Sequence, residues 1–179
     1  MGWSSWETTT GGMFSGPSVP HHRSHSSSHS YHMAPPVAVR EAGIDPAMVR
    51  AGSIAEGRAE PHSTSMCWRY VKEALVAAGG VDSYPQTTYA KEAGRDLVQN
   101  HGFVKLPVHS AERAPIGSVC VYGGSVAGHV ELRTVHGYVS DYRCSRPSGL
   151  PFIGAYTRMD KHHKDLRTAQ IGGSVVAGL

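Results

Sequence analysis

Apolar side chains recur every three or four residues over one stretch of the chain, which is the spacing of a helix with a single buried face. The pattern predicts a helix over residues 66–78. Ser63, Thr64 and Ser65 offer side-chain oxygens that can cap its start, and a glycine pair at 79–80 can end it. The predicted inward positions are Tyr70, Val71, Ala74, Leu75 and Ala78, with Cys67 on the same face.

Two further segments have helical patterns. Residues 86–100 are predicted to form a second helix that ends at residues 101–102. A shorter helix is predicted at residues 44–49, because Asp45 can cap it and Pro46 suits its first position. The predicted inward residues of the second helix are Ala90, Ala93, Leu97 and Val98.

The second half of the chain changes to short β-prone runs separated by turn residues. Glycines and a proline between the runs allow the reversals of an antiparallel meander. Helices followed by strands predict an α+β fold in which helices pack on an antiparallel sheet. The runs contain Ile116, Val119, Val121 and Tyr122, then Val130 and Leu132, then Tyr138 and Val139, and finally Phe152, Ile153 and Tyr156.

A cysteine stands at the start of the first predicted helix. Unpaired backbone N–H groups at a helix start stabilise an anion, and the thiolate is the attacking form of cysteine. His129 follows Gly128 at the start of a predicted strand, and an imidazole near Cys67 would complete an ion pair. We therefore take Cys67 and His129 as a candidate nucleophile and base, although either residue alone is more often structural.

The order of these segments resembles that of the NlpC-type and CHAP-type cysteine hydrolases of bacteria and their phages. The resemblance covers residues 63–158 and rests on CWRYV at 67–71, PIGSVCVY at 115–122, GHV at 128–130 and YVSD at 138–141. It implies a papain-like α+β core, with the nucleophile at a helix N-terminus, that hydrolyses amide bonds in peptidoglycan. In these families a third polar residue orients the histidine, and the resemblance places Asp141 in that role.

Glu131 is a second candidate for orienting the histidine. It lies two residues after His129 and therefore on the same strand face, from which it could also contact a substrate. We rank Asp141 first because it belongs to a neighbouring strand, from which a carboxylate can reach the ring nitrogen away from the thiol. Trp68, Glu131 and Tyr122 are candidate substrate contacts, and the two aromatic residues are equally candidates for the core.

The three cysteines are too few and too scattered for a disulfide framework, and no zinc-type spacing of Cys and His occurs. Cys120 and Cys144 are interpreted as structural, and a disulfide between them stays open. Several histidines lie between residues 21 and 32, in an irregular Ser-rich tract that is typical of flexible polar chain rather than of a metal site. We expect no metal and no cofactor.

Composition divides the chain into four segments. Residues 1–36 are rich in Ser, His, Gly and Pro and are expected to be disordered, and residues 37–62 to be a linker with the short helix. Residues 63–158 are expected to form the catalytic domain, and residues 159–179 a tail. The net charge is +3 with scattered Lys and Arg, which argues against nucleic-acid binding. We also expect no membrane insertion, because the apolar C-terminal end is short and rich in glycine.

These features predict a peptidoglycan hydrolase with a Cys–His thiol mechanism. The start of the chain lacks a signal-peptide pattern, so we expect synthesis in a bacterial cytoplasm and action in the periplasm or cell wall after delivery or lysis. The preferred interpretation is an antibacterial effector toxin, with an immunity protein and a secretion apparatus as partners. The alternatives are a phage lysis enzyme of the same chemistry and a non-catalytic binding module on the same fold.

Overall fold

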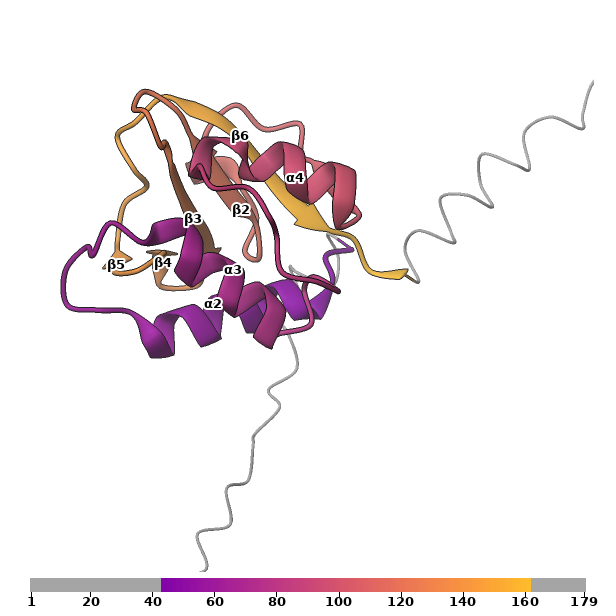
Figure 1. Cartoon of the computed structure of the whole chain (residues 1–179). Helices are drawn as coiled ribbons and strands as arrows, with labels where there is room; N and C mark the ends of the chain where they lie inside the picture. The colour runs from indigo at the N-terminus through magenta and orange to yellow at the C-terminus, as the bar shows by residue number, and fades with distance from the viewer. Residues whose placement is uncertain (1–42, 162–179) are drawn as a thin grey trace, which may run out of the picture. The chain divides into compact units, whose positions relative to one another are not determined.

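The computed structural model describes residues 43–161, in which helices pack against one face of a sheet (Figure 1). This arrangement confirms the α+β class. The helices are α2 (Pro46–Arg58), α3 (Cys67–Ala77) and α4 (Ala93–Asn100), with 3₁₀ turns at Ala90–Glu92 and Ala111–Arg113. The strands are β1 (Phe103–Lys105), β2 (Val119–Tyr122), β3 (His129–Thr134), β4 (Gly137–Val139), β5 (Arg143–Cys144) and β6 (Phe152–Arg158).

The sheet is antiparallel at every pair of strands, in the order β1-β6-β2-β3-β4-β5. Strands β2 to β5 form the predicted meander, whereas β6 returns to pair with the other edge of β2. Side chains alternate between the two faces of a strand. On β3, Val130 and Leu132 point into the core beneath the helices, while His129, Glu131 and Arg133 lie on the opposite face.

Helix α3 begins and ends one residue inside the predicted range, and its expected inward residues are buried except for Tyr70, which is half-buried. The half-buried position suits a polar tip, because the Tyr70 hydroxyl donates a hydrogen bond to Glu60 at 2.9 Å. Gly79 follows with a φ of 69°, the left-handed conformation that ends many helices. The later turns of the helix pack into the core and so fix the position of Cys67 in its first turn.

Helix α2 is longer than the short helix predicted near its start and belongs to the core. Asp45 accepts a hydrogen bond from the Ala47 amide at 2.8 Å, and Pro46 stands in the first turn, as predicted. The apolar side of α2 packs beside α3 and β3. The folded domain thus includes a helix that composition alone assigns to a linker. Residues 1–36, expected to be disordered, lie outside the described residues, and so do residues 162–179 of the expected tail 159–179.

The second helix starts later than predicted. Asp96 accepts hydrogen bonds from the amides of Gln86 and Thr87, at 3.0 and 3.4 Å, so a side chain rather than a helix binds these amides. Ala93 and Leu97 are fully buried as predicted, but the prediction for Val98 was wrong, since it is 40% exposed. Only one narrow side of the eight-residue α4 is buried against the rest of the domain.

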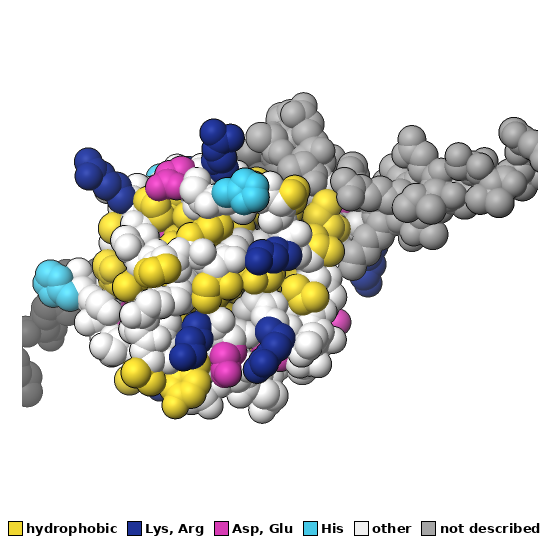
Figure 2. Space-filling view, turned by 90° about the horizontal axis from the view of Figure 1, so that it is seen from above, with side chains coloured by type: hydrophobic (Ala, Val, Ile, Leu, Met, Phe, Trp, Pro, Cys, Tyr) yellow, Lys and Arg dark blue, Asp and Glu magenta, His cyan; other side chains and the backbone are white. Residues whose placement is uncertain are grey.

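The pattern of the sequence also missed β1 and β5, which lie at the two edges of the sheet. They are three and two residues long, too short for any alternation to be recognised. None of the helices among residues 43–161 is both long and apolar enough to cross a bilayer. On the face shown in Figure 2, Lys and Arg side chains lie apart among apolar and uncharged surface rather than in one basic patch.

Candidate active site

Cys67 and His129 meet where the start of α3 crosses the start of β3. Cys67 is the first residue of α3, and His129 is the first residue of β3. Both line a cavity of about 390 Å³ that is open to solvent. Its remaining walls are Ser63, Ser65, Ala127, Gly128, Tyr142, Ser148 and Leu150. The structure therefore brings the two residues singled out from the sequence to one accessible site.

Gly128 is required for the turn that delivers His129. Its φ is 73°, and a Cβ built on it would lie 2.5 Å from the carbonyl oxygen of Tyr122 and 2.6 Å from the side chain of Lys91. The neighbouring Ala127 carbonyl accepts a hydrogen bond from the Lys91 amide at 3.0 Å, which fixes the turn against the start of the 3₁₀ segment. Only glycine satisfies both the backbone conformation and the lack of space.

Glu131 is the carboxylate that lies beside the histidine. Its Oε2 is 3.4 Å from His129 Nε2, and its side chain is buried. Tyr122 donates a short hydrogen bond to Glu131 Oε1, and the Ser148 amide donates to the same oxygen at 3.1 Å. These two donors hold the carboxylate in one orientation. Of the two acids considered from the sequence, Glu131 has the geometry to orient the base.

The electrostatics of His129 follow from these neighbours. Burial alone would lower its pKa, but hydrogen bonding and charge interactions with Cys67 and Glu131 outweigh burial and raise the pKa to about 9. At neutral pH the imidazolium is therefore the favoured form, and it interacts with both the Cys67 thiol and the Glu131 carboxylate. A protonated imidazole beside a cysteine is the arrangement that stabilises a thiolate.

Asp141 does not reach His129 through any hydrogen bond or ion pair found among the described residues. Its fully buried carboxylate instead binds the segment before Cys67: Oδ2 accepts from the amides of Thr64 (2.6 Å) and Met66 (3.2 Å). The hydroxyls of Ser63 and Thr64 add bonds of 3.1 and 3.0 Å, and Ser140 donates to Oδ1 at 3.0 Å. The role of orienting the histidine, assigned to Asp141 by resemblance, is not the role its contacts indicate.

These contacts also change the expected cap of α3. Ser63 and Thr64 turn their hydroxyls toward Asp141 as donors, and the N-cap residue is Met66, which has no side-chain cap of its own. Between the two amides bound by Asp141, Ser65 adopts a φ of 62°, a left-handed conformation that is unusual for a residue other than glycine. Asp141 lies in the bend between β4 and β5, not on a strand as expected, and it anchors a strained turn that precedes the nucleophile.

Burial by itself would raise the pKa of Asp141. Hydrogen bonds from Thr64, Ser140 and Met66 more than offset burial and hold the pKa below its ordinary value, so the carboxylate stays charged. Five donors converge on one buried side chain, which explains how a charge can be accommodated there without an ion pair.

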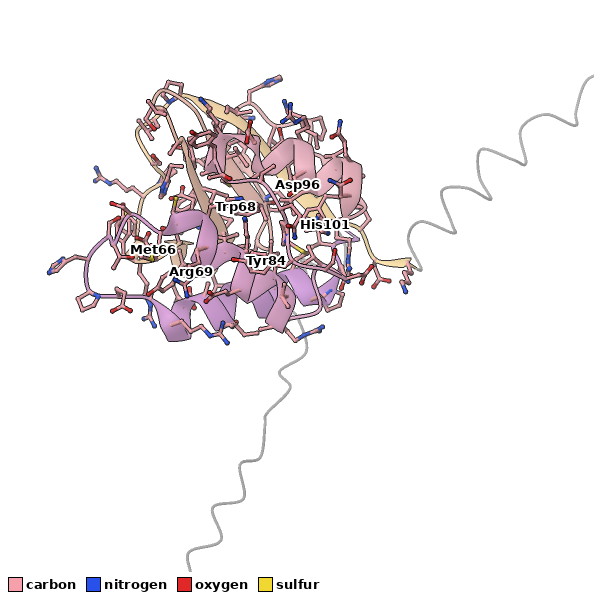
Figure 3. The ribbon with its side chains drawn as sticks, in the orientation of Figure 1. Met66, Trp68, Arg69, Tyr84, Asp96 and His101 are labelled. Carbon is pink, nitrogen blue, oxygen red and sulfur yellow. The ribbon has the colours of Figure 1, made fainter. Side chains whose placement is uncertain are left out.

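The aromatic residues proposed as substrate contacts lie in the core. Trp68 is 4% exposed and donates its indole N–H to the Thr87 carbonyl at 3.0 Å, so it ties α3 to the segment before α4 (Figure 3). Tyr122 is 1% exposed, and its hydroxyl donates a hydrogen bond to Glu131. Neither side chain, nor that of Glu131, lines the cavity. These three assignments as substrate contacts are corrected, because the sheet and α3 bury the side chains.

Tyr142, Ser148 and Leu150 line the cavity instead. Ser148 and Leu150 belong to a segment without a regular hydrophobic pattern, so the sequence did not indicate that they line a cavity. The Pro-Ser-Gly stretch at 147–149 signals a turn in the sequence, but nothing in it indicates that the turn folds back over Glu131.

All three cysteines are free thiols. Cys120 is fully buried on β2, and burial together with the nearby Glu131 charge raises its pKa far above the ordinary value, so it stays an unreactive thiol. Cys144 on β5 is half-buried. Among residues 43–161 no group of three or more His, Cys, Asp and Glu side chains is placed to hold a metal ion.

No protein-family model matches this chain. No curated protein matches it either. It is similar to the type VI native effector-immunity complex Tae3-Tai3 from Ralstonia pickettii, at 22% identity and a TM-score of 0.48, over 62% of this chain and 98% of that one. A selenomethionine form of the complex gives 25% identity and a TM-score of 0.41, over 52% and 80%. Both TM-scores are low, and neither likeness carries a function over to this chain.

Proposed function

We propose that this protein is a thiol hydrolase that cleaves an amide bond in the peptide part of peptidoglycan. The observation that supports it most directly is the meeting of Cys67 and His129 at an open cavity, with Glu131 behind the imidazole. The hydrolase families that the sequence resembles supply the substrate class.

The reaction follows the general course of acyl transfer to a thiol. Cys67 Sγ attacks the carbonyl carbon of the amide, and the oxyanion forms near the Cys67 backbone N–H at the open start of α3. His129 gives its proton to the leaving amine, and the C–N bond breaks to leave a thioester. Water, deprotonated by His129, then attacks the thioester, which releases the carboxylate product and restores the thiol and imidazole pair. Glu131 keeps the imidazole in one orientation throughout.

The test is mass spectrometry of soluble fragments released from purified Gram-negative and Gram-positive peptidoglycan. The wild-type protein should release new peptide fragments, and the Cys67→Ala variant none. Fragment masses will identify the bond, since cleavage at the lactyl link, within the stem and at the cross-link give different products. Absence of fragments from both kinds of wall, with a thiol that still alkylates selectively, would show that the chemistry acts on another substrate.

We propose further that the protein acts as an antibacterial effector. The two similar crystal structures are named as complexes of an effector with an immunity protein. The site is open and requires no cofactor for thiol chemistry, so the enzyme would damage the wall of any cell in whose periplasm it folds. Such a protein needs an immunity protein in its producer and a route of delivery to the target. The phage-lysis alternative shares the chemistry and differs in that no immunity protein is required.

Expression in a sensitive bacterium tests this second step. The chain fused to a periplasmic signal should lyse the cells, while the same chain kept in the cytoplasm and the exported Cys67→Ala variant should not. Protection by a co-expressed protein encoded beside it would distinguish an effector from a lysis enzyme. Normal growth with the exported, folded wild-type protein would count against the effector role while leaving the hydrolase activity to the fragment assay.

A further inference from the structure

One face of β3 carries a line of polar residues that extends beyond the catalytic pair. His129, Glu131 and Arg133 alternate along the strand and therefore project from the same face. At the rise of an extended strand, Arg133 stands about 13 Å from His129, the length of three or four residues of extended peptide. The mechanism uses the first two residues and leaves the third unexplained.

A second cavity of about 500 Å³ opens at the Arg133 end of this line. Ser148 lines both this cavity and the one that holds Cys67 and His129. The Ser148 amide binds Glu131, so this turn lies over the middle of the polar line with an open cavity on each side. The remaining walls of the second cavity are Glu112, Arg133, Tyr138, Ser145, Arg146, Pro147 and Gly149.

Arg133 is held rigidly in this cavity. Its guanidinium lies over the Tyr138 ring at 4.8 Å, and its Nη1 donates to the carbonyls of Thr134 (3.1 Å) and Gly137 (3.0 Å). The Nε group is buried and has no hydrogen-bond partner. Within residues 43–161 neither Arg133 nor Arg146 forms an ion pair with an acidic side chain. A cation that is fixed on the wall of a cavity and has no acidic side chain as its partner among the described residues is a strong site for a carboxylate.

We propose that the second cavity is a subsite for a carboxylate group of the substrate, bound by Arg133 and Arg146 on the far side of Glu131 from the reacting bond. The inference rests on the proposed function and deepens it. On this proposal, the peptide that is cleaved would carry a free carboxylate three or four residues from the scissile amide. Arg133 supplies the rigid contact, and the exposed Arg146 closes over the group from the turn that separates the cavities.

Glu112 offers a control for the charge of the subsite, because it carries the opposite charge to the two arginines. It is an exposed residue on the wall of the same cavity. Removing this charge should strengthen the binding of a carboxylate, whereas removing the charge of Arg146 should weaken it. A cavity that held only apolar or neutral groups would respond to neither change.

The test uses soluble muropeptides released from sacculi by a muramidase, in native form and with their carboxylates methyl-esterified. For the wild type, KM should be about tenfold lower for the native form. Arg146→Gln should raise KM for the native form by about the same factor with little change in kcat, and should remove the preference over the ester. Glu112→Gln should lower KM, and Arg95→Gln, which neutralises an exposed arginine on α4, should leave it unchanged.

Binding to the Cys67→Ala variant, measured by calorimetry, separates this inference from the proposed reaction. Preferential binding of native muropeptides that Arg146→Gln abolishes supports the subsite even if the wild type cleaves nothing, in which case only the reaction is wrong. Equal binding of native and esterified forms overturns the subsite, and so does a preference that survives both Arg146→Gln and Arg133→Gln in a folded protein. No binding and no cleavage would overturn both proposals.

Discussion

Asp141 Oδ2 accepts a hydrogen bond from the Met66 amide at 3.2 Å, one residue before the nucleophile and 75 positions earlier in the chain. The same oxygen binds the Thr64 amide, so the carboxylate clamps both sides of the left-handed Ser65. The position of Cys67 therefore depends on a side chain that does not take part in the chemistry. Asp141 is a positioning residue, and its replacement should affect stability as well as rate.

Replacing Asp141 with Asn should lower the free energy of unfolding by roughly 2–3 kcal/mol. The Asn amide cannot accept all five hydrogen bonds, and its own N–H groups would face hydrogen-bond donors of the protein. Thermal and urea denaturation will measure the loss. Ser140→Ala, which removes one donor to Oδ1, should have a smaller effect in the same direction. An Asp141→Asn variant as stable as the wild type would show that the clamp is dispensable.

The Asp141 clamp also predicts a dependence of stability on acid. The pKa of this carboxyl is lowered in the folded state, so its contribution is complete above the ordinary value of 3.8 and is lost as pH falls through the folded pKa. Wild-type stability should decline over that acidic range, and the decline should be smaller in Asp141→Asn. Urea unfolding at a series of acidic pH values will measure the difference, and parallel curves for the two proteins would contradict it.

Replacing Glu131 with Gln should reduce kcat by a factor on the order of 10² to 10⁴, since the imidazole loses the carboxylate that fixes its orientation and stabilises its charge. Peptidoglycan fragment release over time will measure the rate. The exposed Glu73, which pairs with Arg69, provides a control in Glu73→Gln, expected to keep full activity. A larger loss of rate in a correctly folded Asp141→Asn than in Glu131→Gln would restore the assignment made from the sequence.

The alkaline limit of activity should lie near pH 9, where His129 loses its proton. The raised pKa comes partly from Glu131, so Glu131→Gln should move this limit to lower pH. The pH profile of kcat/KM will show both effects. An alkaline limit that is unchanged in the variant would mean that Glu131 does not interact with the imidazolium during the reaction.

Alkylation should distinguish the three thiols. Cys67 lies in an open cavity beside a protonated imidazole and should react first with iodoacetamide, whereas the fully buried Cys120 should react only after denaturation. Peptide mass spectrometry at short times will identify the modified residue. His129→Ala should slow the modification of Cys67 without exposing Cys120, and equal rates at Cys67 and Cys144 in the native protein would count against an activated nucleophile.

Gly128→Ala should lower both stability and rate. The positive φ and the 2.5 Å approach of an added Cβ to the Tyr122 carbonyl would force the turn to move, and His129 would move with it. The expected loss of stability is at least about 1–2 kcal/mol, the cost of a left-handed alanine. Gly57→Ala in α2, where an added Cβ meets nothing within 4 Å, should instead stabilise the protein slightly. Melting temperatures and fragment release will test both.

The sequence predicts the parts of this protein that depend on local periodicity. The range of α3, the inward residues Val71, Leu75 and Leu97, and the meander of β2, β3 and β4 all follow from spacing and turn residues. The two-residue β5 and the delayed start of α4 do not, because they depend on pairing and on the Asp96 hydrogen bonds rather than on pattern.

The candidate site likewise has residues that the sequence predicts and residues that it does not. A cysteine at a helix start and a histidine after an obligatory glycine can be recognised in the sequence. The choice between Glu131 and Asp141 cannot be made from the sequence, because it depends on where the start of α3 lies relative to β3 and to the bend after β4. Trp68 and Tyr122 lie next to the candidate catalytic positions in sequence or register. The Trp68 indole, however, donates to the half-buried Thr87, and the Tyr122 hydroxyl donates to the buried Glu131. Only the three-dimensional contacts separate core from cavity.

The clamp on Ser65 has a consequence for the order in which activity can appear. Asp141 follows β4, and the segment it binds precedes α3, so the turn before Cys67 reaches its final shape only once the sheet has formed as far as β4. A chain that is still unfolded carries the thiol but lacks the turn that positions it. The proposed hydrolase activity would therefore arise only after the whole domain has folded, so the topology itself would delay the activity of a newly made chain.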